Sequence, residues 1–205
     1  MRHVCICTAL CALLAGGANA KSAKRQEPSN VPPLTIVIDF HGPYSARSVE
    51  EMQREVESIM RGAGRVIEWR TWEQASRATF DELTVVRFYG DCGVRPWPQA
   101  GAEGPLGSTY ISDGTVLPFS DIACDRIATS VRSAILRVDS EQAEIVFGRA
   151  MGRVVAHELV HMVSRSAVHG HEGVTQPALS ESELTRGRLE LSPKDMMRVF
   201  GPERQ

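Results

Sequence analysis

Residue types that bind metal ions are concentrated in one short stretch, residues 156–173, which reads AHELVHMVSRSAVHGHEG and holds four of the six histidines of the chain. His157 and His161 are four residues apart. On a helix of about 3.6 residues per turn, their imidazoles therefore project from the same side, one turn apart. Two such imidazoles can reach one ion, and imidazole is a preferred ligand of zinc. We therefore predict that His157 and His161 bind Zn²⁺.

Glu158 follows the first of these histidines on an adjacent side of the helix, where it can reach a metal-bound water without being a ligand. Zinc lowers the pKa of such a water to about 7, and the carboxylate can accept its proton and pass it to a leaving amine. The pattern H-E-x-x-H thus predicts hydrolysis of peptide bonds, with Glu158 as the general base. In the competing interpretation, the two histidines only cap the C-terminal turn of a helix, where positive charge is stabilised.

A third ligand must come from outside this pattern, because catalytic zinc sites normally have three protein ligands and a water. His169 and His171 lie eight and ten residues beyond His161, which is enough chain for the helix to end and turn back. We favour His169, because Gly170 next to it frees the backbone for a sharp turn. The alternatives are His171 and three downstream carboxylates, Glu172, Glu181 and Glu183.

The pattern lies at the end of a long predicted helix, because apolar residues recur at helical spacing from Asp139 to Leu159. The rest of the chain predicts an α+β fold with a twisted mixed sheet, an edge hairpin, two long helices and a small C-terminal helical part. Pro118, which cannot donate to a sheet, supports the edge position of the hairpin. The expected elements are a strand over residues 34–40, a helix from the N-cap Ser48 to Gly62, strands over 65–70 and 83–89, a hairpin over 108–119 turning at Asp113-Gly114, an irregular segment over 170–187, and a last helix that begins at Ser192-Pro193.

Composition suits one globular domain with a hydrophobic core, which we place at residues 34–205. The 205 residues are 42% hydrophobic, and they include 23 basic and 25 acidic residues. This balance excludes a strongly basic nucleic-acid-binding protein. Residues 21–33 are polar and contain prolines, which predicts a flexible lead-in.

The first 20 residues predict a secretory signal peptide. Arg2 precedes an apolar run over residues 4–15, and small residues end the segment at Ala20. The run is shorter than the roughly 20 residues that a membrane span requires. We therefore expect cleavage after Ala20 and a secreted protein, extracellular or periplasmic, without a membrane span.

Two cysteines, Cys92 and Cys124, would be left after this cleavage, because the other three of the five lie in residues 1–20. In an oxidising compartment an even pair predicts one disulfide, which would stabilise the fold by about 3 to 4 kcal/mol for a loop of this length.

The H-E-x-x-H stretch resembles the metzincin clan of zinc metallopeptidases and, within it, the matrixins. The clan's pattern is H-E-x-x-H-x-x-G-x-x-H, followed by a methionine-bearing turn beneath the metal. His157, Glu158 and His161 match this pattern, whereas Ser164 stands at the glycine position and Ala167 at the position of the third histidine. The nearest histidine comes two residues late, so the sequence resembles a variant with a lengthened connection.

Two further segments bear on this resemblance. No methionine lies between His169 and Met196, so the methionine turn is missing or replaced, around residues 177–179. Residues 191–201, which begin with a Ser-x-x-Asp pattern after Leu191, are similar to the last helix of matrixins. The resemblance implies a zincin-like fold in which the hairpin over residues 108–119 holds an extended peptide substrate by main-chain hydrogen bonds.

The sequence therefore predicts a secreted, monomeric zinc metalloendopeptidase with a protein or peptide substrate and no nucleic-acid partner. Two alternatives stay open. The chain can be an inactive relative that binds zinc or another protein, or a gluzincin-like peptidase with a downstream glutamate as the third ligand.

Overall fold

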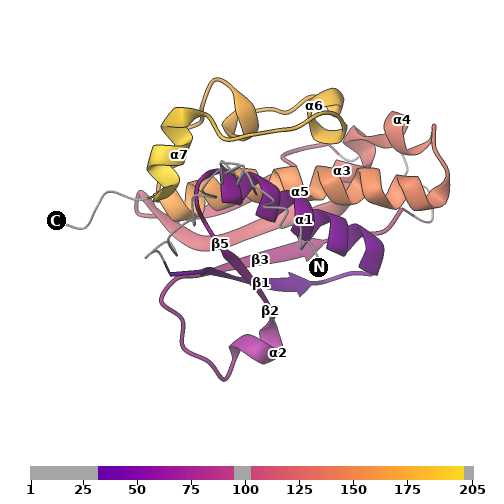
Figure 1. The fold of residues 1–205 in the computed structure, drawn as a ribbon. Helices are drawn as coiled ribbons and strands as arrows, with labels where there is room; N and C mark the ends of the chain where they lie inside the picture. Colours follow the sequence, from indigo (N-terminus) through magenta and orange to yellow (C-terminus); the bar gives the residue numbers. More distant parts are fainter. Residues whose placement is uncertain (1–31, 95–102, 201–205) are drawn as a thin grey trace, which may run out of the picture.

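A five-stranded mixed sheet forms the centre of the fold (Figure 1). The structure is a computed structural model that describes residues 32–94 and 103–200. The strand order is β2-β1-β3-β5-β4, with β4 antiparallel to β5 and all other pairs parallel. The strands are β1 (Leu34–Phe40), β2 (Ile67–Thr71), β3 (Leu83–Tyr89), β4 (Gly107–Ser112) and β5 (Thr115–Ala123).

Two long helices pack against each other over one face of the sheet (Figure 1). A glycine of the longer helix, Gly148, allows their close approach, because a Cβ there would lie 2.4 Å from the carbonyl oxygen of Ser48 on the other helix. The helices are α1 (Ala46–Gly62), α2 (Trp72–Ala75), α3 (Cys124–Ser130), α4 (Arg132–Ile135), α5 (Ser140–Ser164), α6 (Glu181–Thr185) and α7 (Pro193–Phe200), and a short 3₁₀ helix η1 spans Gly173–Thr175.

The predicted α+β class, mixed sheet and two long helices are confirmed, and both β1 and β3 have the predicted bounds. The predicted N-cap Ser48 is wrong. Helix α1 begins at Ala46, and its N-cap is Ser45, whose hydroxyl accepts the backbone N–H of Ser48. The Ser48 hydroxyl instead donates to the carbonyl of Glu144 in α5, because helix packing buries it.

The hairpin prediction is correct in its turn but only half correct in its position. Asp113 and Gly114 both have positive φ, 49° and 76°, as a two-residue hairpin turn requires. Strand β4 forms the edge of the sheet, but β5 pairs with both β3 and β4. Pro118 is tolerated there because pairing with β3 begins only at Phe119, and the β4 register is irregular between Thr109 and Ile111.

The segment 170–187 is more ordered than the sequence predicts, because it contains η1 and α6. Helix α6 is only five residues long, too short for a hydrophobic period, and it is stabilised by a capping box between Ser180 and Glu183. The last helix begins as predicted, at Pro193. The predicted signal peptide over residues 1–20 and nearly all of the lead-in over 21–33 lie outside the described residues.

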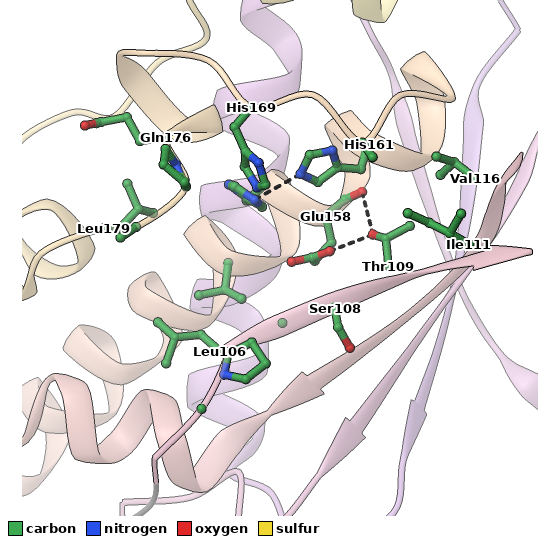
Figure 2. Close-up of a pocket in the computed structure, with 18 of the residues that line it drawn as sticks. Leu106, Ser108, Thr109, Ile111, Val116, Glu158, His161, His169, Gln176 and Leu179 are labelled. Carbon is green, nitrogen blue, oxygen red and sulfur yellow. Dashed lines mark hydrogen bonds between the residues drawn. The ribbon is translucent and has the colours of Figure 1, made fainter. Parts of the chain in front are cut away.

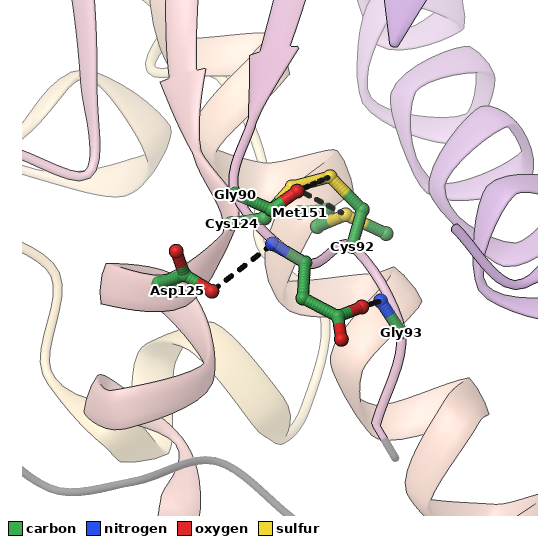
Figure 3. Close-up of a disulfide and its surroundings, with 7 residues drawn as sticks. Gly90, Cys92, Gly93, Cys124, Asp125 and Met151 are labelled. Atoms are coloured by element: carbon green, nitrogen blue, oxygen red, sulfur yellow. Dashed lines mark hydrogen bonds between the residues drawn. A yellow bond between two sulfur atoms is a disulfide. The ribbon is translucent and has the colours of Figure 1, made fainter. Parts of the chain in front are cut away.

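The predicted disulfide between Cys92 and Cys124 is present (Figure 3). It ties the chain just beyond β3 to the start of α3. Both cysteines are fully buried, and the Cys124 sulfur lies 3.9 Å from the sulfur of Met151 in α5. No helix within the described ranges is long and apolar enough to cross a membrane.

Candidate metal centre

His157 and His161 lie on the last turns of α5, with their imidazole Nε2 atoms 3.1 Å apart. His157 is half-buried and His161 is buried. Each Nδ1 is held by a backbone carbonyl, at 2.8 Å from Val174 O for His157 and 2.7 Å from Ser166 O for His161. A carbonyl only accepts hydrogen bonds, so each Nδ1 carries a proton, and in the neutral form of the ring each Nε2 keeps a free lone pair.

Two unprotonated nitrogens that face each other at this distance cannot hydrogen-bond to each other. A cation that both nitrogens bind, either a proton or a metal ion, resolves the arrangement. Two ligands in a tetrahedral zinc site with bonds of about 2.05 Å are separated by about 3.3 Å, close to the spacing found here. Hydrogen bonds from Nδ1 to backbone carbonyls are also the usual outer contacts of metal-binding histidines.

His169 returns to the two helix histidines after α5 has ended. Its ring centroid lies 5.2 Å from that of His157 and 4.8 Å from that of His161 (Figure 2). Ligand atoms of the three residues all lie within 4.8 Å of one another. The widest of these separations exceeds the spacing in a tetrahedral site, so the exposed His169 has to swing inward to complete it. With that movement, the three imidazoles fit a divalent transition metal.

The chain reverses between the second and third histidine because α5 ends in a left-handed residue. Arg165 has φ 50°, an unusual conformation for a residue other than glycine. Its N–H donates to the carbonyl of Met162, and the N–H of Ser166 donates to that of His161. This turn also aims the Ser166 carbonyl at the His161 ring, so the helix end and the ligand orientation depend on the same backbone geometry.

Both neighbours of His169 are held in place. The N–H of Gly170 donates to the carbonyl of Thr175 at 2.9 Å, and the guanidinium of Arg198 donates to the carbonyl of Val168 at 3.1 Å. Gly170 has a different role from the one that we predicted. It leaves space for the Thr175 side chain and does not adopt an unusual turn conformation. Its φ is not positive, but a Cβ there would lie 2.2 Å from the Thr175 hydroxyl.

Asp195, at the start of α7, anchors this loop through hydrogen bonds of its carboxylate. Its side chain is only 1% exposed. Its carboxylate accepts hydrogen bonds from the hydroxyls of Thr175 and Ser192, both at 2.6 Å, and from the guanidinium of Arg198 at 3.1 Å. Burial alone would raise the pKa of Asp195, but these hydrogen bonds and the charge of Arg198 outweigh it and lower the pKa.

Glu158 points from α5 toward the edge strand β4 (Figure 2). Its Oε2 accepts a hydrogen bond of 2.6 Å from the hydroxyl of Thr109, and the residue is 5% exposed. Burial raises the pKa of Glu158, while the Thr109 hydrogen bond and the nearby histidines partly offset the shift. A raised pKa suits a carboxyl that must both accept and donate a proton.

Burial lowers the pKa of His157 and of His161, although their bonds to backbone carbonyls oppose this shift. A lowered pKa favours the neutral imidazole, which is the form that binds metal ions.

The candidate metal centre opens into a cleft of about 560 Å³ between β4 and the segment that follows η1. None of the described residues that line it is Lys or Arg. Its walls include residues 177–179, the segment around which the sequence suggested that a methionine turn is missing or replaced. The lining outside the centre includes Leu106, Ile111, Val116, Val154, Ala167, Gln176, Pro177, Ala178 and Leu179.

A buried arginine stabilises the segment next to the cleft wall. Arg153 is one turn before His157 on α5 and is 1% exposed. Its guanidinium donates to the carbonyls of Glu183, Arg186 and Gly187 at 2.5 to 2.7 Å, and its Nε donates to Glu55 of α1 at 2.7 Å. The segment after the cleft lining is thereby bound to both long helices.

The other ligands considered from the sequence lie elsewhere. His171 and Glu172 are exposed. Both Glu181 carboxylate oxygens accept the Ser133 hydroxyl, and Glu183 belongs to the α6 capping box. Within the described part of the chain, only His157, His161 and His169 form a group that could hold a metal ion.

Sequence reasoning missed Thr109, Arg153 and Asp195 as parts of the site. Asp195 had a local signal, because it stands three residues after Ser192 in the Ser-x-x-Asp pattern. Thr109 and Arg153 had none, because their partners are 49 and at least 30 residues away in the chain.

The chain matches no family model and no curated protein.

Proposed function

We propose that this protein is a secreted, zinc-dependent endopeptidase in which His157, His161 and His169 hold the metal and Glu158 is the general base. The observation that carries the proposal is the pair of Nε2 atoms 3.1 Å apart, on two imidazoles whose Nδ1 atoms are each hydrogen-bonded to a backbone carbonyl. The metzincin resemblance is part of this proposal, with residues 177–179 in place of a methionine turn.

Zinc at such a site acts as a Lewis acid and lowers the pKa of water to about 7. The chain supplies the proton transfer. Glu158 is buried beside the helix histidines, and its raised pKa suits it to take a proton during attack on the peptide carbonyl and to give it to the leaving amine. His157 and His161 stay neutral, and their Nδ1 bonds keep both rings aimed at the same point.

The cleft favours an extended polypeptide as the substrate. Strand β4 is the edge of the sheet and lines the cleft through Gly107, Ser108, Thr109 and Ile111. An extended peptide can add to such an edge by main-chain hydrogen bonds. A lining without Lys or Arg among the described residues offers no partner for an acidic substrate side chain, so we expect acidic residues to be disfavoured next to the cleaved bond. The disulfide is compatible with secretion.

The decisive experiment measures zinc content and cleavage of a peptide library by the purified mature protein, with and without a chelator. We expect about one zinc per chain and cleavage that the chelator abolishes. Glu158→Gln should keep its zinc and lose about 10²- to 10⁴-fold in kcat, the range for removal of a general base. Glu141→Gln, an exposed substitution at the start of the same helix, is the matched control and should leave cleavage unchanged.

Full zinc occupancy without cleavage of any peptide would refute the peptidase and favour a zinc-binding relative. Zinc retention in His169→Ala, compared with His171→Ala and Glu181→Ala, tests the third ligand separately. We expect only the first of these variants to lose zinc. Loss in Glu181→Ala instead would favour the gluzincin-like alternative.

A further inference from the structure

Thr109 of the edge strand β4 contacts the proposed general base directly. Its hydroxyl oxygen lies 2.6 Å from Oε2 of Glu158 and 3.5 Å from the backbone carbonyl oxygen of the same residue (Figure 2). A hydroxyl has one proton to donate, and the shorter contact is to the acceptor that carries charge. The Thr109 proton is therefore directed at the carboxylate.

Gly107 brings β4 close enough for this contact. A Cβ at Gly107 would lie 2.7 Å from Oε1 and 2.9 Å from Cγ of Glu158, so a side chain there would displace Glu158 from its present position. Gly107 and Thr109 are two residues apart on a strand and so face the same side of it. The Glu158 carboxylate thus lies against β4, with Oε2 hydrogen-bonded to Thr109 and Oε1 in the space that the missing side chain of Gly107 leaves open.

This contact has a consequence for proton transfer. A glutamate side chain loses rotamer freedom when it is fixed, and a general base works only within hydrogen-bond reach of the proton that it takes. A hydrogen bond that forms before the substrate binds supplies this ordering in advance. Because Thr109 occupies Oε2, Oε1 is the oxygen left to take up a proton.

We propose that Thr109 is a positioning residue, whose hydroxyl orients the Glu158 carboxylate from the strand along which the substrate lies. This inference rests on the proposed function, because it requires Glu158 to act as the base. The strand then has two tasks, to align the peptide and to align the group that acts on it.

Two substitutions separate the hydroxyl from the shape of the side chain. Thr109→Val removes the donor and keeps the branched shape, whereas Thr109→Ser keeps the donor. We expect kcat to fall about tenfold in Thr109→Val, which equals about 1.4 kcal/mol of activation free energy, with KM and zinc content unchanged. Thr109→Ser should stay within about twofold of the wild type. Thr109→Ala repeats the test should the valine variant fold poorly, and Thr115→Val, on the other strand of the hairpin, is the control.

A second measurement does not depend on activity. Crystal structures of the metal-free wild type, Thr109→Val and Thr109→Ser should show the Glu158 carboxylate displaced only in the valine variant. The proposal is overturned by a valine variant with wild-type kcat, by a serine variant as slow as the valine variant, or by an undisplaced carboxylate. Should wild-type protein with bound zinc cut no peptide, the peptidase proposal fails, whereas a displaced carboxylate in the metal-free variant would still support the positioning contact.

Discussion

Asp195 offers a test of whether the C-terminal helix controls the candidate metal centre. In Asp195→Ala, the hydroxyls of Thr175 and Ser192 and the guanidinium of Arg198 lose a buried, charged acceptor. Hydrogen bonds to charged groups contribute about 1.5 to 3 kcal/mol each, but bonds that share one acceptor are not additive. Breaking a buried ion pair typically costs 3 to 5 kcal/mol. We therefore expect the free energy of unfolding to fall by about 3 kcal/mol.

The same substitution should weaken zinc binding. Thr175 accepts the N–H of Gly170 next to His169, so loosening Thr175 lets the third ligand drift. Substitution of groups that orient metal ligands typically costs 10- to 100-fold in metal affinity. Urea unfolding of the metal-free protein gives the stability, and competition with a chromophoric chelator gives the zinc affinity. Lys194→Ala, at the exposed neighbouring position of α7, is the control and should change neither quantity.

A double-mutant cycle separates the two effects. If Asp195 acts on zinc through His169, then Asp195→Ala should change zinc affinity much less in a His169→Ala background than in the wild type. The reasoning would be refuted by a variant that loses about 3 kcal/mol of stability and keeps wild-type zinc affinity. Asp195 would then support the fold without placing the ligand.

Three further predictions concern stability. Because the pKa of Asp195 is lowered in the folded state, its contribution is fully present above the unfolded value of about 3.9 and is lost as the pH falls through the folded value. The difference in unfolding free energy between wild type and Asp195→Asn, measured in urea at several pH values, should therefore be constant above about pH 5 and shrink below about pH 4; growth of the difference in acid would contradict this sign. Arg153→Met should lower the unfolding free energy by about 3 to 5 kcal/mol, because it leaves Glu55 and three carbonyls without their donor, and Arg153→Lys should recover only part of it. The Cys92→Ala/Cys124→Ala double variant should lose about 3 to 4 kcal/mol in the same assay, and an unchanged urea midpoint would show that the disulfide adds nothing.

Local patterns predicted much of the fold. Strands β1 and β3 are rich in apolar and β-branched residues, the Asp113-Gly114 turn has a specific backbone requirement, and α5 follows the capping residue Asp139 and has apolar residues at helical spacing from Ala143. In each case, the signal and the structure it specifies lie within a few residues of each other. The errors arose where contacts between distant segments determined the local structure. One such contact buries the Ser48 hydroxyl against α5.

The sequence by itself determined which residues can bind a metal, because helical spacing alone places His157 and His161 one turn apart with Glu158 beside them. Only the tertiary structure decided that His169 lies beside these two histidines. It also decided which groups orient the three imidazoles and Glu158. The loop that carries His169 also supplies the carbonyls that hold both helix histidines, and it is anchored by Asp195, 26 residues beyond His169 in the chain. Thr109 reaches Glu158 across 49 residues. Spacing in sequence predicts neighbours on one helix, whereas contacts between a helix, a loop and a sheet edge depend on how these elements pack.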